Sequence, residues 1–354
     1  MFCLLSAESR VPEKHPLRAI KGMCEAVLKD LSPTFDEMYS ADGRDSVPPE
    51  RLLKATVLMA LYTIRSERQF CEQLDYNMLF RWFLDMDMLE ERFHHTTFSK
   101  NRQRLISHDV AKLFFGLVVQ QARTAGLMSR EHFTVDGTLI EAWASFKSLR
   151  RKDDKSKKEP PDDPGNPTVD FRGEKLRNET HESTTDPEAK LARKGKGKEA
   201  KLAFAAHALM ENRNGLLVDL RITDAVGTTE RDAALTMIDE ALPGTARLTV
   251  AGDKGYDTED FVRGCRERNV TPHVARNITA RRRSAIDERT ASHPGYQISQ
   301  RIRKRIEEIF GWCKTVGNFR KTRYRGRERN QLAAHFVGAA YNLLRIARLT
   351  GASA

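Results

Sequence analysis

The hydrophobic pattern of the chain changes near residue 130, and this change constrains the fold more than any other feature. Before it, residues 13–127 carry apolar side chains at helical spacing, with few glycines or prolines. After it, short apolar runs typical of strands alternate with helical segments, and the turn sequence Asn214-Gly215 predicts a hairpin. Strands are expected at 132–136, 202–210, 216–222, 247–252 and 271–275, and helices at 229–242, 258–269 and from 299 onward. This order predicts an α/β fold in which helices cover a mixed sheet, preceded by an all-α domain.

The stretch 147–200 interrupts the α/β region and has no hydrophobic periodicity. Lys, Arg and Asp dominate its first part, four prolines follow, and Lys alternates with Gly at 194–198. Such a composition buries too little apolar area to offset the entropy lost on ordering. We therefore expect a helical domain at 1–127 and a second domain at 128–350, with 147–200 as a long, charged, largely disordered insertion.

The composition favours a basic protein of the cytoplasm. The formal net charge of the 354 residues is +11, which favours polyanions such as nucleic acid, although a basic structural protein would share it. The five cysteines include no C-x-x-C pair, so neither a disulfide framework nor a structural zinc site is supported. No apolar run is long enough to span a membrane, and the first residues do not resemble a signal peptide.

Much of the positive charge lies in two segments. Between residues 301 and 330, eleven lysines and arginines stand against three acidic residues, with Phe319 and Tyr324 among them. A cationic stripe with aromatics fits binding to phosphates and stacking on unpaired bases. A helix near residues 96–105 would be either the second helix of a DNA-binding helix-turn-helix or an ordinary solvated face, and the net charge favours DNA. Its solvent-facing cations would be Lys100, Arg102 and Arg104.

Two aspartates stand at the C-terminal ends of expected strands, where ligand sites gather in α/β folds. Asp136 is the last residue of the strand expected at 132–136, and Asp253 follows the strand at 247–252. Carboxylates on neighbouring strands could share magnesium ions, and a pair of ions about 4 Å apart can act on a phosphodiester. Each aspartate alone is better explained as a turn residue, because glycine follows both closely.

Glu307 strengthens the case for a metal site. On a helical wheel of about 100° per residue, Arg303, Glu307 and Lys314 share one narrow stripe at the margin of the apolar face. Glu308 points away to solvent on the same wheel. A carboxylate between two cations at a core margin suits a metal and phosphate site, while an ordinary Arg–Glu pair is the alternative.

Several motifs together resemble one known family. The later ones are Val135-Asp136-Gly137-Thr138, Gly252-Asp253-Lys254-Gly255-Tyr256 and Arg303-Lys304-Arg305-Ile306-Glu307-Glu308. The earlier ones are His15-Pro16-Leu17-Arg18, Phe80-Arg81-Trp82-Phe83 and Thr97-Phe98-Ser99. Over nearly its whole length the chain resembles bacterial insertion-sequence transposases of the DDE type, in the group like insertion sequence 5. The resemblance implies a ribonuclease-H-like fold.

The resemblance also implies a catalytic site. Asp136, Asp253 and Glu307 would bind two metal ions, expected to be Mg²⁺, which Mn²⁺ could replace. The family's last helix often carries Tyr-x2-Arg-x3-Glu-x6-Lys, and Arg303, Glu307 and Lys314 fit that spacing. Gln300 occupies the place of the tyrosine, and the nearest tyrosine is Tyr296.

The implied function is cut-and-paste DNA transposition at the inverted repeats of the protein's own element. The protein is expected to act as a homodimer on double-stranded DNA. We expect it in the bacterial cytoplasm, associated with the nucleoid. A DNA-binding protein derived from a transposase but lacking catalysis, and a nuclease without strand transfer, remain alternatives. His273 and His335 are interpreted as structural histidines rather than proton carriers. Beyond the helix at 96–105, the expected DNA contacts are Arg303, Lys314, Lys254, Arg320, Lys321, Arg323 and Arg325.

Overall fold

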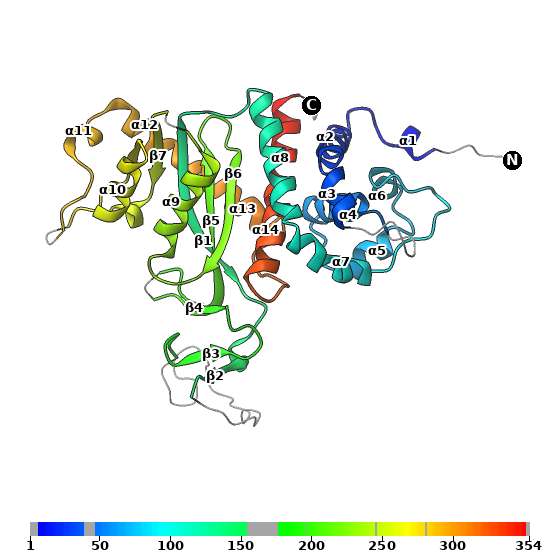
Figure 1. Cartoon of the computed structure of the whole chain (residues 1–354), viewed down its shortest axis with the longest axis horizontal. Coiled ribbons are helices and arrows are strands. Elements are labelled where there is room, and N and C mark those ends of the chain that lie inside the picture. The colour runs from blue at the N-terminus through cyan, green and yellow to red at the C-terminus, as the bar shows by residue number, and fades with distance from the viewer. Residues whose placement is uncertain are drawn as a thin grey trace. The chain divides into compact units, whose positions relative to one another are not determined.

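The computed structural model describes residues 6–38, 47–153, 176–195, 197–244, 246–279 and 282–351. The chain forms two compact units, whose elements are labelled in Figure 1. The helical unit comprises residues 1–129, 311–318 and 332–354, and the strand unit comprises 130–310 and 319–331. The first boundary falls close to the expected division at residue 127. The two segments after residue 310 group with the helices, although the sequence suggested a second domain running to residue 350.

The N-terminal part of the helical unit consists of short helices, in agreement with the helical pattern of the sequence. Phe70 stacks on Phe80 with ring centroids 5.6 Å apart, and Phe98 meets Phe70 edge-on at 6.2 Å. All three are buried, so this aromatic cluster forms part of the core. The helices are α1 (Ala7–Arg10), α2 (Pro16–Asp30), α3 (Ser32–Met38), α4 (Pro49–Leu61), α5 (Glu67–Gln73), α6 (Met78–Phe83), α7 (Thr96–Ser107) and α8 (Val110–Thr124).

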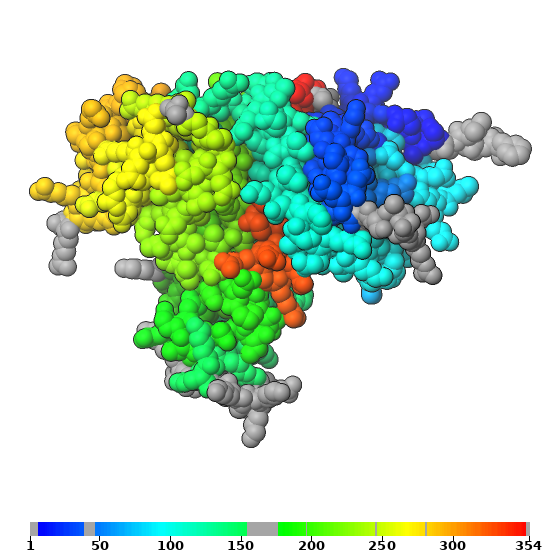
Figure 2. All heavy atoms as spheres, in the orientation of Figure 1, coloured from blue at the N-terminus to red at the C-terminus, as the bar shows by residue number. Residues whose placement is uncertain are grey.

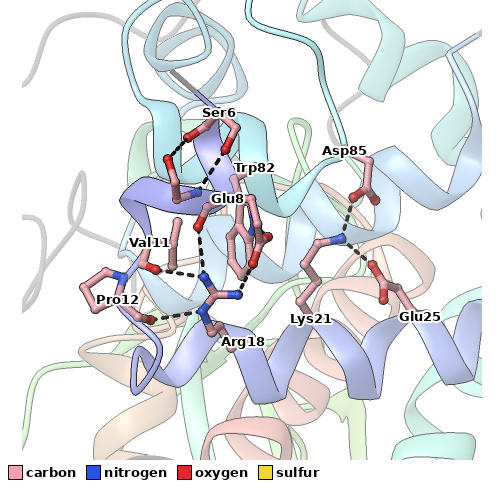
Figure 3. A network of polar contacts seen from close by, with 10 residues as sticks. Ser6, Glu8, Val11, Pro12, Arg18, Lys21, Glu25, Trp82 and Asp85 are labelled. Carbon is pink, nitrogen blue, oxygen red and sulfur yellow. Dashed lines mark hydrogen bonds and ion pairs between the residues drawn. The ribbon is translucent and has the colours of Figure 1, made fainter. Parts of the chain in front are cut away.

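A polar network attaches α1 to α2 and α6 (Figure 3). Glu8 on α1 pairs with Arg18 on α2 and accepts a hydrogen bond from the indole of Trp82 on α6. Farther along α2, Lys21 pairs with Glu25 and with Asp85 (Figure 3). A four-residue helix is too short to be stable alone, so these contacts hold α1 in place.

The strand unit is built on a mixed sheet in the order β6-β5-β1-β7-β8. β1, β5 and β6 run antiparallel to their neighbours in this group, whereas β7 and β8 are parallel to β1. This arrangement is ribonuclease-H-like, as expected. The strands are β1 (His132–Glu141), β5 (Lys201–Glu211), β6 (Leu217–Asp224), β7 (Leu248–Gly252) and β8 (Val270–Val274).

Helices cover the sheet, and α9 (Thr229–Ala241) packs on β5, β6 and β1 (Figure 1). α10 (Glu259–Glu267) packs on β8 and α9. α11 (Glu288–Ala291) and α12 (Pro294–Ile302) also pack on β8. A short 3-10 turn, η2 (Lys254–Tyr256), follows β7 directly.

The hairpin between β5 and β6 forms where Asn214-Gly215 predicted it. Gly215 has a positive φ of 70°, a conformation that glycine adopts at little cost. The buried carboxylate of Glu211 accepts hydrogen bonds from the backbone amides of Arg213, Asn214 and Leu216 at 2.7–3.0 Å. The turn is therefore closed by a side chain as well as by its backbone.

β1 is longer than the sequence suggested. The strand expected to end at Asp136 continues to Glu141, and its whole second half pairs with β5. Asp136-Gly137 therefore lies inside a strand, and the turn interpretation of this pair was wrong. Pairing with β7 is much shorter, from His132 to Thr134.

The expected disordered insertion contains ordered parts. Strand β2 (Leu149–Arg151), preceded by the 3-10 turn η1 (Phe146–Ser148), pairs with β3 (His181–Ser183), and β4 (Lys190–Ala192) pairs with β5. These strands are labelled at the lower end of the strand unit in Figure 1, and the same region is drawn mostly in green in Figure 2. Three-residue strands are too short to give hydrophobic periodicity, so the sequence did not reveal them. Residues 154–175 of the insertion lie outside the described part of the chain.

The C-terminal region is helical with interruptions. A 3-10 turn, η3 (Arg303–Arg305), separates α12 from α13 (Ile306–Lys314), and α14 (Arg327–Leu349) follows a break. Arg303 and Glu307 are therefore not on one continuous α-helix, and a wheel drawn through both was wrong in its angles because a 3-10 turn has three residues per turn. Within the part of the chain that the structure describes, no helix is long and apolar enough to cross a membrane.

Candidate active site

Asp136 and Asp253 are brought side by side by the register of β1 and β7. The last residues paired between these parallel strands are Thr134 and Ala251. Asp136 and Asp253 each lie two residues beyond that pair. Because the strands are parallel, both aspartates lie in the same direction from it along the sheet. Asp253 also caps η2, because its Oδ1 accepts a hydrogen bond from the Gly255 amide at 2.7 Å.

Asp136 is a half-buried carboxylate surrounded by other negative charges. Its Oδ1 accepts a hydrogen bond from the Gly137 amide at 2.8 Å. Burial raises the pKa of Asp136 to about 7, against the effect of that amide, and the charges of Asp253, Glu230 and Glu307 add to the rise. The site is therefore a concentration of acidic groups from four different elements.

Glu307 lies in the first turn of α13 and is exposed, as is its neighbour Glu308. The buried side chains of this helix include Ile306 and Ile309, so Glu307 follows directly after a core residue. The charge of Glu307 raises the pKa of Asp136, which supports its choice as the third carboxylate. Its role as a metal ligand stays a prediction.

Glu230 belongs to this group of carboxylates, and the sequence did not reveal it. It lies in the first turn of α9, where an acidic residue is ordinarily explained by the helix dipole. Its Oε1 accepts a hydrogen bond from the Tyr256 hydroxyl at 3.1 Å. Burial and then the charge of Asp253 raise the pKa of Glu230. Gly137 was the available signal, since a glycine inside a strand often marks the close approach of another group.

Tyr256 is fully buried and stands at the end of η2. Burial, followed by the charges of Glu230 and Asp136, raises the pKa of Tyr256 well above its ordinary value. The phenol therefore stays protonated and remains a donor to Glu230. Its ring packs closely on Gly252, where an added Cβ would lie 3.1 Å from the ring.

Gln300, which stands where the family motif has tyrosine, holds Arg303. Its amide nitrogen donates a hydrogen bond to the backbone carbonyl of His273, and its Oε1 accepts one from Arg303 Nε at 3.0 Å. Tyr296, the nearest tyrosine, is buried and donates its hydroxyl to the Val274 carbonyl at 2.8 Å. Gln300 rather than Tyr296 thus contacts the arginine of the motif.

The other expected DNA contacts lie mainly on exposed positions. Arg323 is half-buried and stacks over the Tyr324 ring at 4.9 Å. Lys314 belongs to the helical unit, whereas Glu307 belongs to the strand unit. The exposed cations of the set are Lys254, Arg320, Lys321 and Arg325.

The helix expected to enter DNA differs from its prediction in two ways. Residues 84–95 separate α6 from α7, which is much longer than the three- to four-residue turn of a helix-turn-helix. The proposal that α7 is the second helix of that motif was therefore wrong. Lys100 and Arg104 are exposed as expected, but Arg102 is half-buried and pairs with Glu67 at 2.5 Å.

The two histidines considered as proton carriers have structural contacts. His273 is buried, and its Nδ1 lies 2.8 Å from the Ser299 hydroxyl. Burial lowers the pKa of His273 to about 4. The ring of His335 stacks on Phe115 within the helical unit, with centroids 5.8 Å apart. These contacts support their interpretation as structural residues.

The acidic side chains of the site raise one another's pKa values. Among the residues that the structure describes, no three His, Cys, Asp or Glu side chains form a group that could hold a metal ion. The four acidic side chains at the site offer carboxylate oxygens, the donors that hard divalent cations prefer.

Two family models match successive parts of the chain. A family described as "Transposase DDE domain" matches residues 129–343, and one described as "Transposase domain (DUF772)" matches residues 5–104. No curated protein sequence matches the chain.

Two solved structures are similar in part. A piggyBac transposase synaptic complex with hairpin DNA has 10% identity and a TM-score of 0.43, covering 98% of this chain and 77% of that one. A pre-cleavage Mos1 transpososome has 11% identity and a TM-score of 0.22, covering 94% of this chain and 97% of that one.

Proposed function

The chain belongs to the transposases with a DDE domain, and we propose that it cuts and rejoins DNA at the ends of its own insertion sequence by a cut-and-paste reaction. The observation that carries this proposal is the meeting of Asp136 and Asp253 beyond the last paired residues of β1 and β7. The charge of Glu307, which acts on Asp136, supports the third position of the triad.

Transposases of this family are metal-dependent enzymes of DNA cleavage and strand transfer. In our proposal Asp136, Asp253 and Glu307 hold two Mg²⁺ ions, which Mn²⁺ can replace. The all-carboxylate donor set fits these hard cations. Ions bound there would supply stabilisation of the attacking and leaving oxygens during phosphodiester exchange.

Basic side chains of both units would hold DNA in place. Gln300 orients Arg303 by accepting a hydrogen bond from its Nε, which leaves the other guanidinium nitrogens to bind a phosphate by charge-assisted hydrogen bonds. Lys314 would add a second phosphate contact. The exposed cations Lys254, Arg320, Lys321 and Arg325 would bind the DNA backbone, as would Arg323 of the same unit and Lys100 and Arg104 on α7 of the helical unit.

The test uses the full chain and DNA that carries the terminal inverted repeats flanking its reading frame. We expect cleavage in Mg²⁺ and the appearance of joined products with a target DNA. Asp136→Asn, Asp253→Asn and Glu307→Gln should each abolish cleavage while end binding, measured by gel shift, is largely retained. Cutting by Asp136→Asn in Mg²⁺ would show that the assignment is wrong.

Glu308→Gln is the matched control for the third carboxylate, because Glu308 is the exposed neighbour of Glu307. It should cut at the wild-type rate. Loss of cleavage in Glu308→Gln with retention in Glu307→Gln would reverse the assignment. Cleavage without joined products would instead favour a nuclease, and end binding without any cleavage would favour a non-catalytic DNA-binding protein.

A cut-and-paste reaction must bring two DNA ends together, so we propose a homodimer on DNA. Light scattering of the purified complex should give two protein chains for each pair of ends. One chain per complex at saturating DNA would contradict this stoichiometry.

A further inference from the structure

Glu230 sits against the backbone of the strand that carries Asp136. A Cβ added to Gly137 would lie only 2.5 Å from Glu230 Oε1, so the carboxylate occupies the space where a side chain would otherwise stand. We propose that Glu230 is a fourth acidic residue of the metal site, contributing charge to the binding of the divalent cations. This inference rests on the proposed function and adds a residue outside the expected triad.

The carboxylate is held by a chain of contacts that ends at Asp253. The fully buried Tyr256 donates its hydroxyl to Glu230 Oε1 at 3.1 Å. Tyr256 closes the 3-10 turn that Asp253 caps through the Gly255 amide. The first turn of α9, which carries Glu230, is thereby connected through Tyr256 to the turn that Asp253 caps.

The balance of charge around Glu230 favours a cation. The negative charge of Asp253 acts on Glu230, and the negative charge of Glu230 acts on Asp136. Arg231 opposes this repulsion in part, and its guanidinium also donates to the Gly255 carbonyl at 3.3 Å. Partly buried charges are costly unless they are paired or bind a metal. A divalent ion would offset the repulsion between these carboxylates.

The contacts of Glu230 distinguish this role from a structural one. Its hydrogen-bond donor Tyr256 is a neutral phenol, which any acceptor oxygen at that place would satisfy. Replacement of Glu230 by Gln keeps an acceptor oxygen for Tyr256 and removes the charge. Replacement of Tyr256 by Phe keeps the charge and removes the hydrogen bond. The two variants therefore separate charge from positioning.

The experiment measures binding of Mn²⁺ to the full chain without DNA, by electron paramagnetic resonance of the unbound ion. Glu230→Gln should weaken Mn²⁺ binding about tenfold, a size typical of residues that support a metal site. Tyr256→Phe should weaken it less, because the charge remains. Glu308, the exposed neighbour of Glu307, supplies the control. Glu308→Gln should bind Mn²⁺ like the wild type.

Gly137→Ala tests the same inference without changing any charge. The added methyl group would displace the Glu230 carboxylate, so Mn²⁺ binding should weaken. Gly227→Ala is the matched control, since nothing lies within 4 Å of the added group there. Melting temperatures measured without metal identify any variant that fails to fold, and Glu230→Gln preserves enough of the local contacts to remain the decisive variant.

The outcomes separate this inference from the proposed function. If Asp136→Asn abolishes Mn²⁺ binding and Glu230→Gln binds like the wild type, Glu230 is structural and the inference is overturned while the triad stands. If Asp136→Asn also binds Mn²⁺ like the wild type, the metal site itself is misplaced. Weakening in both variants, with Glu308→Gln unchanged, supports a site with four carboxylates.

Discussion

Asp136 must lose its proton to bind a cation, yet its surroundings favour the protonated form. Burial raises the pKa of Asp136 to about 7, and three other carboxylates add to the effect. The unfolded chain has no such surroundings, so its Asp136 ionises near the ordinary value for aspartate. The pKa is thus higher in the folded state, and the protonated carboxyl favours folding.

The stability of the metal-free protein should therefore decrease as the pH rises from about 4 to about 7. The contribution of Asp136 is fully present below the unfolded pKa and is lost as the pH passes the folded one. Its size is up to about 4 kcal/mol, because one pKa unit corresponds to about 1.4 kcal/mol. Urea unfolding in the presence of a chelator at pH 5 and pH 7.5 measures it.

Asp136→Asn is the control for this prediction, because asparagine does not titrate. Buried histidines such as His207, whose pKa is lowered to about 4 by burial, change stability in the opposite direction as the pH falls. Taking the difference between wild type and Asp136→Asn removes their effect. Equal pH dependence of the two proteins would contradict the prediction, and added Mn²⁺ should restore the wild type at pH 7.5.

Sequence alone predicted part of this group of carboxylates. Asp136 and Asp253 could be found because each follows an apolar run that forms a strand. Glu230 was missed because its approach to Gly137 depends on how α9 packs on the sheet, which no local pattern specifies. Gln300 likewise contacts Arg303 through side-chain geometry that motif spacing does not contain.

At the scale of elements, one glycine within α13 and one just after it have opposite expected effects. Gly317 follows the helix, and an added Cβ would lie 2.7 Å from Val337 Cγ1 and 2.9 Å from the Cys313 carbonyl. Gly311 lies within the helix, is exposed, and has nothing within 4 Å of an added Cβ. Both belong to the helical unit.

Gly317→Ala should destabilise the protein by about 1–3 kcal/mol, because a backbone carbonyl cannot move aside cheaply. Gly311→Ala should stabilise it by roughly 0.5–1 kcal/mol through higher helix propensity. Guanidinium unfolding of the two variants measures both effects under one set of conditions. A stabilising effect of Gly317→Ala would show that the contact with Val337 is looser than described.

Elements with a long or distinctive local signal were predicted, and elements that depend on partners were not. The β5–β6 hairpin could be predicted because Asn214-Gly215 favours a tight turn. The second half of β1 could not, because Gly137 resembles a turn residue until β5 supplies its pairing. The same reason applies to β2, β3 and β4, which are short strands stabilised by their neighbours.

At the scale of the whole molecule, the net charge of +11 favours DNA, but the number of phosphate contacts should set how DNA binding depends on salt. The logarithm of the binding constant falls linearly with the logarithm of the salt concentration, and each phosphate contact contributes about 0.9 to the steepness of this line. Replacing Arg320, Lys321 and Arg325 together by Gln should therefore reduce the slope by up to about 3. Fluorescence anisotropy with labelled DNA at several salt concentrations gives the slope directly.

Arg263→Gln is the control for the salt dependence. Arg263 is exposed on α10 and pairs with Asp260 and Glu267 of the same helix, so it should leave the slope unchanged. An unchanged slope in the triple variant would exclude those three cations from the DNA-binding surface. A reduced slope in both proteins would indicate a general effect of net charge.

The two compact units are interleaved along the chain. α13 and α14 both begin in the strand unit and end in the helical unit, which therefore needs three separate stretches of coding sequence. A recombination event with one breakpoint near codon 129 would carry away an incomplete helical unit. A fragment made at that breakpoint should therefore be less stable than the same residues are within the full chain, because two of the three stretches of the helical unit are missing.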